Sequence, residues 1–145
     1  MSERLRLDNQ LCFAIQAASR AMNAAYRPLL EALGVTYPQY LVLLTLWEED
    51  GARVSRIGER LYLDSATLTP LLKRLEKRAL VERRRLPRDE RVVQIFLTAR
   101  GKRLKKQALA VADGFFCKLQ LSPTHASRLR DELKGLTQRL HGSAA

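Results

Sequence analysis

Hydrophobic residues near the start of the chain recur every three or four positions, which is the spacing of one helix face. The recurring positions are Leu7, Leu11, Ile15, Ala18, Met22, Tyr26, Leu29 and Leu33. Gly34 follows them as a C-terminal stop signal, and Pro38 suits the first turn of a second helix. The pattern predicts a long helix over 7–35 and a shorter apolar helix that ends in the acidic turn at 48–51.

The middle of the chain reads as two short helices followed by two strands. Val54, Ile57 and Leu61 mark the first helix, and Asp64 or Ser65 can cap the second. That second helix has one apolar stripe, formed by Leu68, Leu71, Leu72 and Leu75. Residues 80–83 and 92–97 read as strands, and the polar connection 84–91 predicts a hairpin tip. This order predicts a winged helix-turn-helix core over 38–97, with a recognition helix at about 65–78 and a wing at about 81–97.

The last part of the chain is again helical in pattern. Thr98 can cap a long helix, and Ser122 with Pro123 starts another. The end segments 7–35 and 98–141 carry apolar stripes that the small middle unit cannot cover, so we expect them to be dimerisation helices. Burying each Leu-sized side chain contributes about 1.5–3 kcal/mol. The alternative is a monomer whose end helices fold back on the winged core. Residues 1–145 are thus expected to form one mainly α domain with a small β-hairpin wing.

The net charge of +11 is concentrated in one segment. Residues 53–106 hold 17 Lys and Arg against 6 Asp and Glu, whereas the rest of the chain holds 9 of each sign. A localised excess favours docking of a polyanion such as double-stranded DNA, and a merely solvated basic surface is the alternative. No apolar run approaches the roughly 20 residues of a membrane span. We find no signal peptide in 1–8, so we expect a cytoplasmic protein without membrane contact, whose thiols are kept reduced.

The exposed face of the predicted recognition helix combines small, hydroxyl and basic side chains. Such a helix fits the major groove, where threonines meet base edges and the cations meet phosphates or guanine. Pro70 forfeits a hydrogen bond to the Ala66 carbonyl, so we expect a bend there or a helix that begins late. The predicted DNA contacts are Ser65, Ala66, Thr67, Thr69, Pro70, Lys73, Arg74 and Lys77.

The predicted hairpin is rich in arginine, which suits the negative potential of the minor groove. Either Asp89 or Glu90 can orient one arginine by pairing with its guanidinium. An ordinary exposed hairpin is the alternative for these charges. The predicted DNA contacts of the wing are Arg84, Arg85, Arg88, Asp89 and Arg91.

Asp89 and Arg91, followed by Leu97, Thr98 and Gly101, resemble the D-x-R…L-T-x-x-G signature of the MarR family wing. Segments 7–14, 33–40 and 61–75 further resemble the organic-hydroperoxide-sensing (OhrR-like) branch of that family. The resemblance implies a homodimeric repressor on a palindromic operator, released when an organic hydroperoxide oxidises the Cys12 thiolate.

The resemblance also implies roles for three other side chains. The hydroxyls of Tyr26 and Tyr37 match two tyrosines that hydrogen-bond the reactive sulfur in this branch. Cys117 lies where some members carry a second cysteine, which closes a disulfide with the reactive cysteine of the other subunit. The residues around Cys117 match less closely than those around Cys12.

The chemistry of such a sensor is consistent with the position of Cys12 near the start of the first helix. A thiolate attacks peroxide, and the helix dipole favours negative charge at that end. The resulting sulfenic acid condenses with a nearby thiol. The alternative is that both cysteines merely pack, as free cysteines often do.

Three other functions fit parts of the sequence. One is a MarR-type repressor released by a small aromatic ligand, with incidental cysteines. Another is a thiol peroxidase, in which the basic wing would have no purpose. The third is a nucleoid protein that ignores DNA sequence. His125 and His141 stand apart from Cys or carboxylate clusters, so we expect no metal site. No glycine-rich phosphate loop or Ser/His/Asp pattern occurs, so we expect no cofactor and no enzymatic activity.

Overall fold

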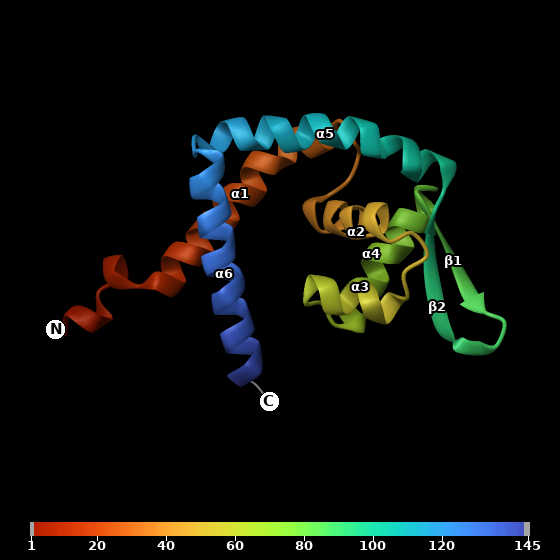
Figure 1. The fold of residues 1–145 in the computed structure, drawn as a ribbon, viewed down its shortest axis with the longest axis horizontal. Coiled ribbons are helices and arrows are strands. Elements are labelled where there is room, and N and C mark those ends of the chain that lie inside the picture. Colours follow the sequence, from red (N-terminus) through yellow and green to blue (C-terminus); the bar gives the residue numbers. More distant parts are fainter. Residues whose placement is uncertain (1, 144–145) are drawn as a thin grey trace.

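The computed structural model describes residues 2–143, which form helices and one β-hairpin in the predicted order. Two short 3₁₀ turns, Glu3–Leu5 and Leu7–Asn9, precede the first long helix. The other elements are α1 (Leu11–Glu31), α2 (Tyr37–Glu48), α3 (Val54–Leu61), α4 (Ser65–Lys77), β1 (Val81–Leu86), β2 (Asp89–Leu97), α5 (Ala99–Leu119) and α6 (Pro123–Ser143). In Figure 1, α5 lies across the top of α2, α3, α4 and the hairpin, while α1 and α6 descend to one side. The predicted winged helix-turn-helix with flanking long helices is confirmed.

Side-chain caps explain where several helices begin. The Thr36 hydroxyl accepts from the Gln39 backbone N–H, and the Gln39 side chain accepts from the Thr36 N–H, so α2 starts with a capping box. Asp64 caps α4 by accepting from the Thr67 N–H at 2.8 Å. Thr98 caps α5 by accepting from the Gly101 N–H at 3.0 Å, as predicted.

The hydrophobic core lies inside the winged unit, defined here as residues 37–97. The predicted leucine stripe of α4 is buried against α2, α3 and the hairpin, and the first half of α5 closes the core from above. The most deeply buried side chains include Leu43, Leu46, Ile57, Leu68, Leu72, Leu75, Val81 and Ile95.

The first turn of α5 is fastened to the winged unit by several polar contacts. Trp47 Nε1 donates to the Gly101 carbonyl at 3.0 Å. Asp50 Oδ1 accepts from the Leu97 N–H at 2.7 Å, and its carboxylate pairs with Lys102 at 3.7 Å. These contacts join the end of α2, the base of the wing and the start of α5 into one body.

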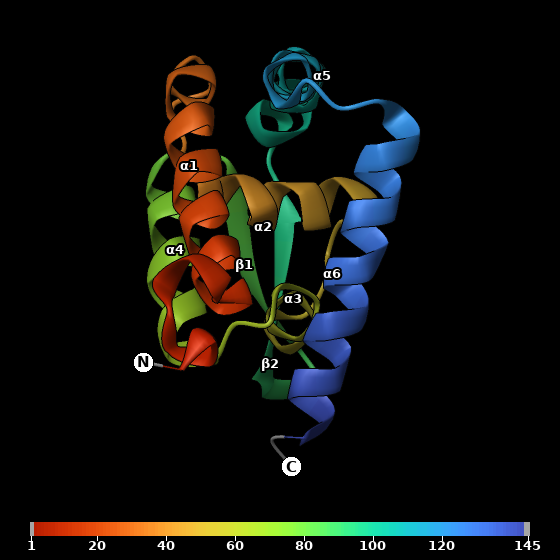
Figure 2. The same ribbon diagram turned by 90° about the vertical axis from the view of Figure 1, so that its left-hand side faces the viewer.

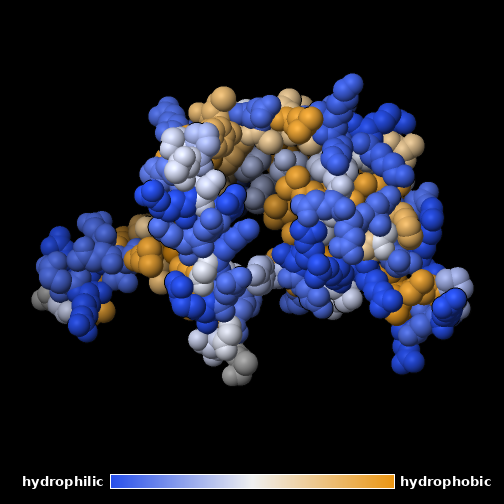
Figure 3. Space-filling model, in the orientation of Figure 1, coloured by the Kyte–Doolittle hydropathy of each residue, from blue (hydrophilic) through white to orange (hydrophobic). Residues whose placement is uncertain are grey.

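Two of the three long helices, α1 and α6, are poorly covered within the chain, and α5 is covered on one face only. Among residues 123–143, which make up α6, none is buried, and α1 buries only Leu30. Figure 2 shows α1 and α6 as separate arms on opposite sides of the molecule. Figure 3 shows hydrophobic surface beside the N-terminal arm and on α5. Exposed apolar side chains on these elements include Leu7, Leu11, Phe13, Met22, Leu109, Phe116, Leu129, Leu133 and Leu140.

Several local features differ from those predicted from the sequence. The first helix begins at Leu11, not at 7, and ends at Glu31. The side-chain amides of Asn9 and Gln10 donate to the carbonyls of Glu3 and Arg4, so this segment forms 3₁₀ turns instead of a helix. The start of α1 therefore depends on side-chain amide hydrogen bonds, which the pattern of apolar residues does not reveal.

The hairpin is longer and its tip shorter than expected. Strand pairing extends to Leu86 opposite Asp89, with an irregularity after Arg85, so the tip comprises only residues 87–88. Leu80 lies before β1, because Ala79 adopts a left-handed conformation (φ 57°) that turns the chain there. The late start considered for α4 is also wrong, since the helix runs from Ser65 through Pro70. No helix within residues 2–143 is long and apolar enough to cross a bilayer.

Candidate nucleic-acid interface and cysteine site

The recognition helix presents one continuous polar face to solvent. Because Leu68, Leu71, Leu72 and Leu75 are turned into the core, the predicted contact residues lie on the other side of α4. All of them are exposed except the half-buried Thr69: Ser65, Ala66, Thr67, Pro70, Lys73, Arg74 and Lys77. The structure thus brings the helix part of the predicted interface together.

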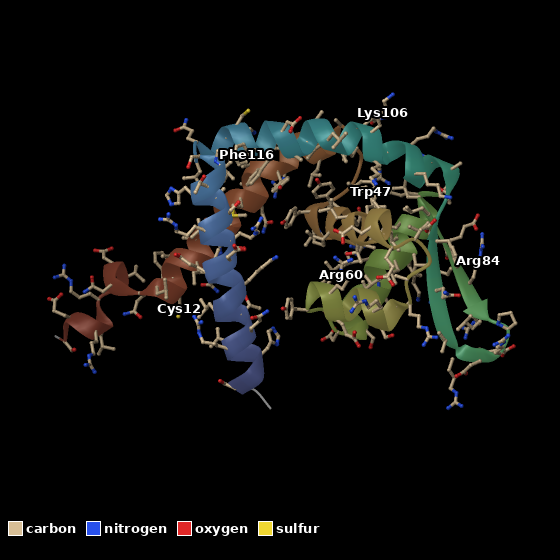
Figure 4. All side chains as sticks on the ribbon, in the orientation of Figure 1. Cys12, Trp47, Arg60, Arg84, Lys106 and Phe116 are labelled. Atoms are coloured by element: carbon tan, nitrogen blue, oxygen red, sulfur yellow. The ribbon has the colours of Figure 1, made fainter. Side chains whose placement is uncertain are left out.

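The arginines of β1 alternate between the two faces of the hairpin. The Arg83 backbone N–H donates to the Glu76 carboxylate of α4 at 3.2 Å, so this position lies beside the recognition helix. Arg84 instead stacks its guanidinium 4.4 Å above the Phe96 ring and pairs with Glu82 at 2.9 Å. Figure 4 shows Arg84 on the side of the hairpin remote from α4. Arg84 is therefore separated from the other predicted contacts.

A cleft of about 430 Å³ lies between α4 and the wing. Ser65 and Thr69 line it from α4, and Arg91 lines it from β2. The Arg91 Nε lies 3.4 Å from the Asp89 carboxylate, so Asp89 is the carboxylate of the two that lies beside Arg91. Arg88 is exposed at the hairpin tip.

The same cleft contains two further arginines: the sequence indicated Arg83 only as one of the hairpin arginines, and it did not indicate Arg53. Arg53, just before α3, and Arg83 of β1 both line it. The alternation of β1 around the buried Val81 could have identified Arg83, whereas Arg53 had only the general charge excess as a signal.

Cys12 is an exposed free thiol at the second residue of α1. Gln10, which precedes the helix, makes no side-chain capping bond in the described part of the chain. The first N–H groups of α1 and its helix dipole therefore favour negative charge close to the Cys12 sulfur.

Tyr26 and Tyr37 belong to a packed aromatic cluster far from Cys12. The Tyr26 ring stacks on Phe115 of α5 with centroids 3.9 Å apart, and lies 4.8 Å from the Tyr37 ring. Burial, with the nearby Tyr37 and Tyr40, raises the pKa of Tyr26 to about 12, and burial raises the pKa of Tyr37 as well. Both hydroxyls are therefore protonated donors at neutral pH. Tyr26 follows Cys12 by 14 residues on one helix, a separation of about 21 Å.

Cys117 is an exposed free thiol in the last turn of α5. There α5 packs on the C-terminal half of α1: Gly114 lies against Leu29, and Lys118 Nζ donates to the Ala25 carbonyl at 3.3 Å. Ala25 is 13 residues beyond Cys12, or about 20 Å along the helix. Figure 4 accordingly shows Cys12 far from the corner where neighbouring Phe116 lies. A disulfide needs Cα atoms within about 7 Å, so one chain cannot join its own two cysteines.

Residues 2–143 contain no group of three or more His, Cys, Asp or Glu side chains placed to bind a metal ion. The functional candidates are therefore the α4–wing surface and the two thiols.

Comparisons with known proteins agree with this arrangement. Residues 35–93 match the MarR family. The chain is 45% identical to the organic hydroperoxide resistance transcriptional regulator of Bacillus subtilis (strain 168), over 96% of this chain and 95% of that protein.

Structures of AbfR of Staphylococcus epidermidis are also similar. Reduced AbfR bound to DNA has a TM-score of 0.77 and 40% identity, covering 95% of this chain and 96% of that one. Overoxidized AbfR bound to DNA gives the same score and identity, covering 95% and 97%. Disulfide-formed AbfR has a TM-score of 0.66 and 42% identity, covering 93% and 95%.

The curated relative is a transcriptional regulator, which favours a regulatory role for this chain over the thiol peroxidase alternative. The identity extends over nearly the whole of both chains, and the family match covers α2 to β2. This chain belongs to the MarR family of transcriptional regulators.

Proposed function

We propose that this regulator is a homodimeric repressor that binds a palindromic operator and leaves it when an organic hydroperoxide oxidises Cys12. The observation that carries the proposal is an exposed thiol at the start of α1 in a chain 45% identical to an organic hydroperoxide resistance regulator. The α4 face and the wing supply DNA binding, and the long helices supply the dimer.

DNA binding is supported by the charge and shape of the α4–wing surface. The helix enters the major groove with Ser65, Thr67 and Thr69 near base edges, while Lys73 and Arg74 neutralise phosphates. Arg91, oriented by Asp89, reaches the minor groove from the wing. AbfR, which is 40% identical to this chain, has been solved bound to DNA, and this supports DNA binding by this chain.

Dimerisation is supported by the uncovered helices. A 21-residue helix without a buried residue, such as α6, gains its stability from packing against a partner. The partner subunit covers Leu129 and Leu133, and two winged units then face successive half-sites of a palindrome.

Sensing begins with attack of the Cys12 thiolate on the terminal oxygen of the hydroperoxide. The O–O bond breaks, sulfur is oxidised to a sulfenic acid, and the alkoxide leaves and takes up a proton to become an alcohol. Because Tyr26 lies about 21 Å from Cys12 along the same helix and Tyr37 packs beside Tyr26, we assign both hydroxyls to Cys12 of the other subunit. Their raised pKa keeps them protonated, so they donate to and stabilise the thiolate.

The second step joins the subunits. The Cys117 thiolate of the other subunit attacks the Cys12 sulfur, an S–S bond forms, and hydroxide leaves and is protonated to water. The distance between the two thiols of one chain supports this pairing between subunits. Thiol reductants reverse it.

Release follows because the disulfide displaces α5 and α1 at the dimer interface. Since Trp47, Asp50 and Thr98 hold the first turn of α5 to the winged unit, the wing and α4 move together with α5. The two recognition helices then no longer match the half-site spacing. Overoxidized AbfR is itself bound to DNA, so we assign release to the disulfide rather than to a charged sulfur acid.

The test uses DNA duplexes selected by the protein from a random pool, followed by fluorescence anisotropy during titration with cumene hydroperoxide. Wild type is expected to dissociate after about one equivalent per subunit, and a thiol-reversible band of twice the subunit mass appears on a non-reducing gel. Cys12→Ser is expected to bind DNA normally and to ignore the oxidant. Cys117→Ser is expected to be oxidised and to remain largely on DNA.

Three outcomes contradict the proposal. Dissociation of Cys12→Ser under hydroperoxide would remove the sensing role of that thiol. Release of wild type by salicylate-like compounds, with no response to hydroperoxide, would favour the aromatic-ligand alternative. Equal affinity for all duplexes at moderate salt would favour the nucleoid alternative.

A further inference from the structure

Tyr62 occupies an unusual backbone position at the end of α3. Its φ of 55° is left-handed, a conformation that glycine usually supplies at this point of a helix. The Leu63 N–H donates to the Gly58 carbonyl at 2.9 Å, which closes the helix end around Tyr62. The ring is thereby directed away from the winged core and is 57% exposed.

The Tyr62 ring meets the far end of the chain. It stacks on the His141 ring of α6, with centroids 4.6 Å apart and planes at 25°. Tyr62 also lines an apolar hollow of about 410 Å³, whose other walls are Met22 of α1, Leu119 of α5 and Leu129 and Leu133 of α6. It is the one residue of the winged unit on that lining.

The Tyr62–His141 pair attaches the winged unit to α6. The other attachments join the winged unit to α1 and α5, through the Tyr26–Tyr37 cluster and through Trp47 and Asp50. Without the Tyr62–His141 contact α6 can pivot relative to α3, whereas with it the angle between them is defined. Figure 1 shows this frame, with α5 above the winged unit and α6 descending beside α3.

We propose that Tyr62 and His141 are positioning residues for operator binding: their stack sets the angle between the winged unit and α6, and hence the distance between the two recognition helices of the dimer. The proposal rests on the proposed DNA binding and dimerisation. Palindromic operators present half-sites about 34–36 Å apart, so a small change in angle changes which spacing fits. The chain as described, with the stack formed, is closer to DNA-bound AbfR than to disulfide-formed AbfR.

The test compares variants on operators whose half-site spacing is changed by one or two base pairs. Tyr62→Gly removes the ring and suits the backbone, and His141→Ala removes the stacking partner. Each is expected to weaken binding to the preferred spacing about three- to ten-fold, the change that corresponds to loss of one aromatic pair. Each is also expected to flatten the spacing preference, which a loss of stability alone would not do.

Matched variants separate the stack from other effects. Tyr62→Phe keeps the ring, and His125→Ala removes the other histidine of α6, so both should bind within about two-fold of wild type with unchanged spacing preference. The double variant Tyr62→Gly/His141→Ala is expected to bind DNA with about the same affinity as the single variant that binds less tightly.

Additive losses in the double variant, or an unchanged spacing preference in the single variants, would overturn the inference. Failure of the wild type to bind any duplex with two half-sites would instead refute the proposed function.

Discussion

Gly101 lies in the first turn of α5 with its backbone against Leu80. A methyl group there would overlap the Leu80 carbonyl oxygen and press on Leu97, so the helix could not approach the wing base. We expect Gly101→Ala to destabilise the protein by about 1–3 kcal/mol, as overpacking does. Urea unfolding at fixed protein concentration measures this. Gly142→Ala, with nothing within 4 Å of the added carbon, should differ from wild type by less than about 0.5 kcal/mol.

Asp64 gives a pH-dependent prediction at the same scale. Hydrogen bonds from Thr67 to its carboxylate lower the pKa of Asp64 below its ordinary value of 3.8. A depressed folded-state pKa means that the carboxylate stabilises the fold above the unfolded pKa and loses this effect as pH falls through the folded value. The difference in Tm between wild type and Asp64→Ala should therefore be constant from pH 7 to about pH 5. This difference should shrink only at lower pH. The difference in Tm between Asp64→Asn and Asp64→Ala should not change with pH, because neither side chain ionises.

The wing makes a prediction at the scale of one element. Arg91 lines the cleft beside Ser65 and Thr69, whereas Arg84 is held by Phe96 and Glu82 on the other face. We expect Arg91→Ala to weaken operator binding about ten-fold or more and to reduce its salt dependence, since one charged DNA contact is lost. Arg84→Ala should change affinity less than about two-fold. Anisotropy titrations at several salt concentrations test both, and equal losses would contradict the two-faced wing.

The helices were largely predictable because their signals are local. Val54, Ile57 and Leu61 gave α3 its bounds, and Asp64 with the leucine stripe gave α4. The wing tip was missed because strand length depends on pairing across the hairpin, which composition does not encode. The sequence also listed Arg84 as a contact, and in the structure strand alternation turns Arg84 away from α4.

Contacts between distant segments were beyond sequence reasoning. The thiols Cys12 and Cys117 could be proposed from resemblance, but the antiparallel packing that sets Lys118 beside Ala25 depends on the folded core. The stack of Tyr62 on His141 joins residues that no periodicity links.

The whole molecule depends on its uncovered helices. Leu133 of α6 is 40% exposed and faces the apolar hollow, where a partner subunit would cover it. We expect Leu133→Asp to give monomers in sedimentation experiments and to lose operator binding, because a buried, unpaired carboxylate is strongly unfavourable. Glu132→Lys, at an exposed polar position, should remain dimeric. A Leu133→Asp dimer with normal binding would place the interface elsewhere.

The separation of the two cysteines along one chain has a consequence for how the signal is read. In a single subunit, Cys117 lies too far from Cys12 to form a disulfide with it. Under the proposed mechanism, a monomer whose Cys12 is oxidised would therefore form no reversible disulfide. Under the proposed mechanism, only the assembled dimer would be switched and reset by thiol chemistry. A bridge between subunits would also keep the two subunits joined until a reductant cleaves it.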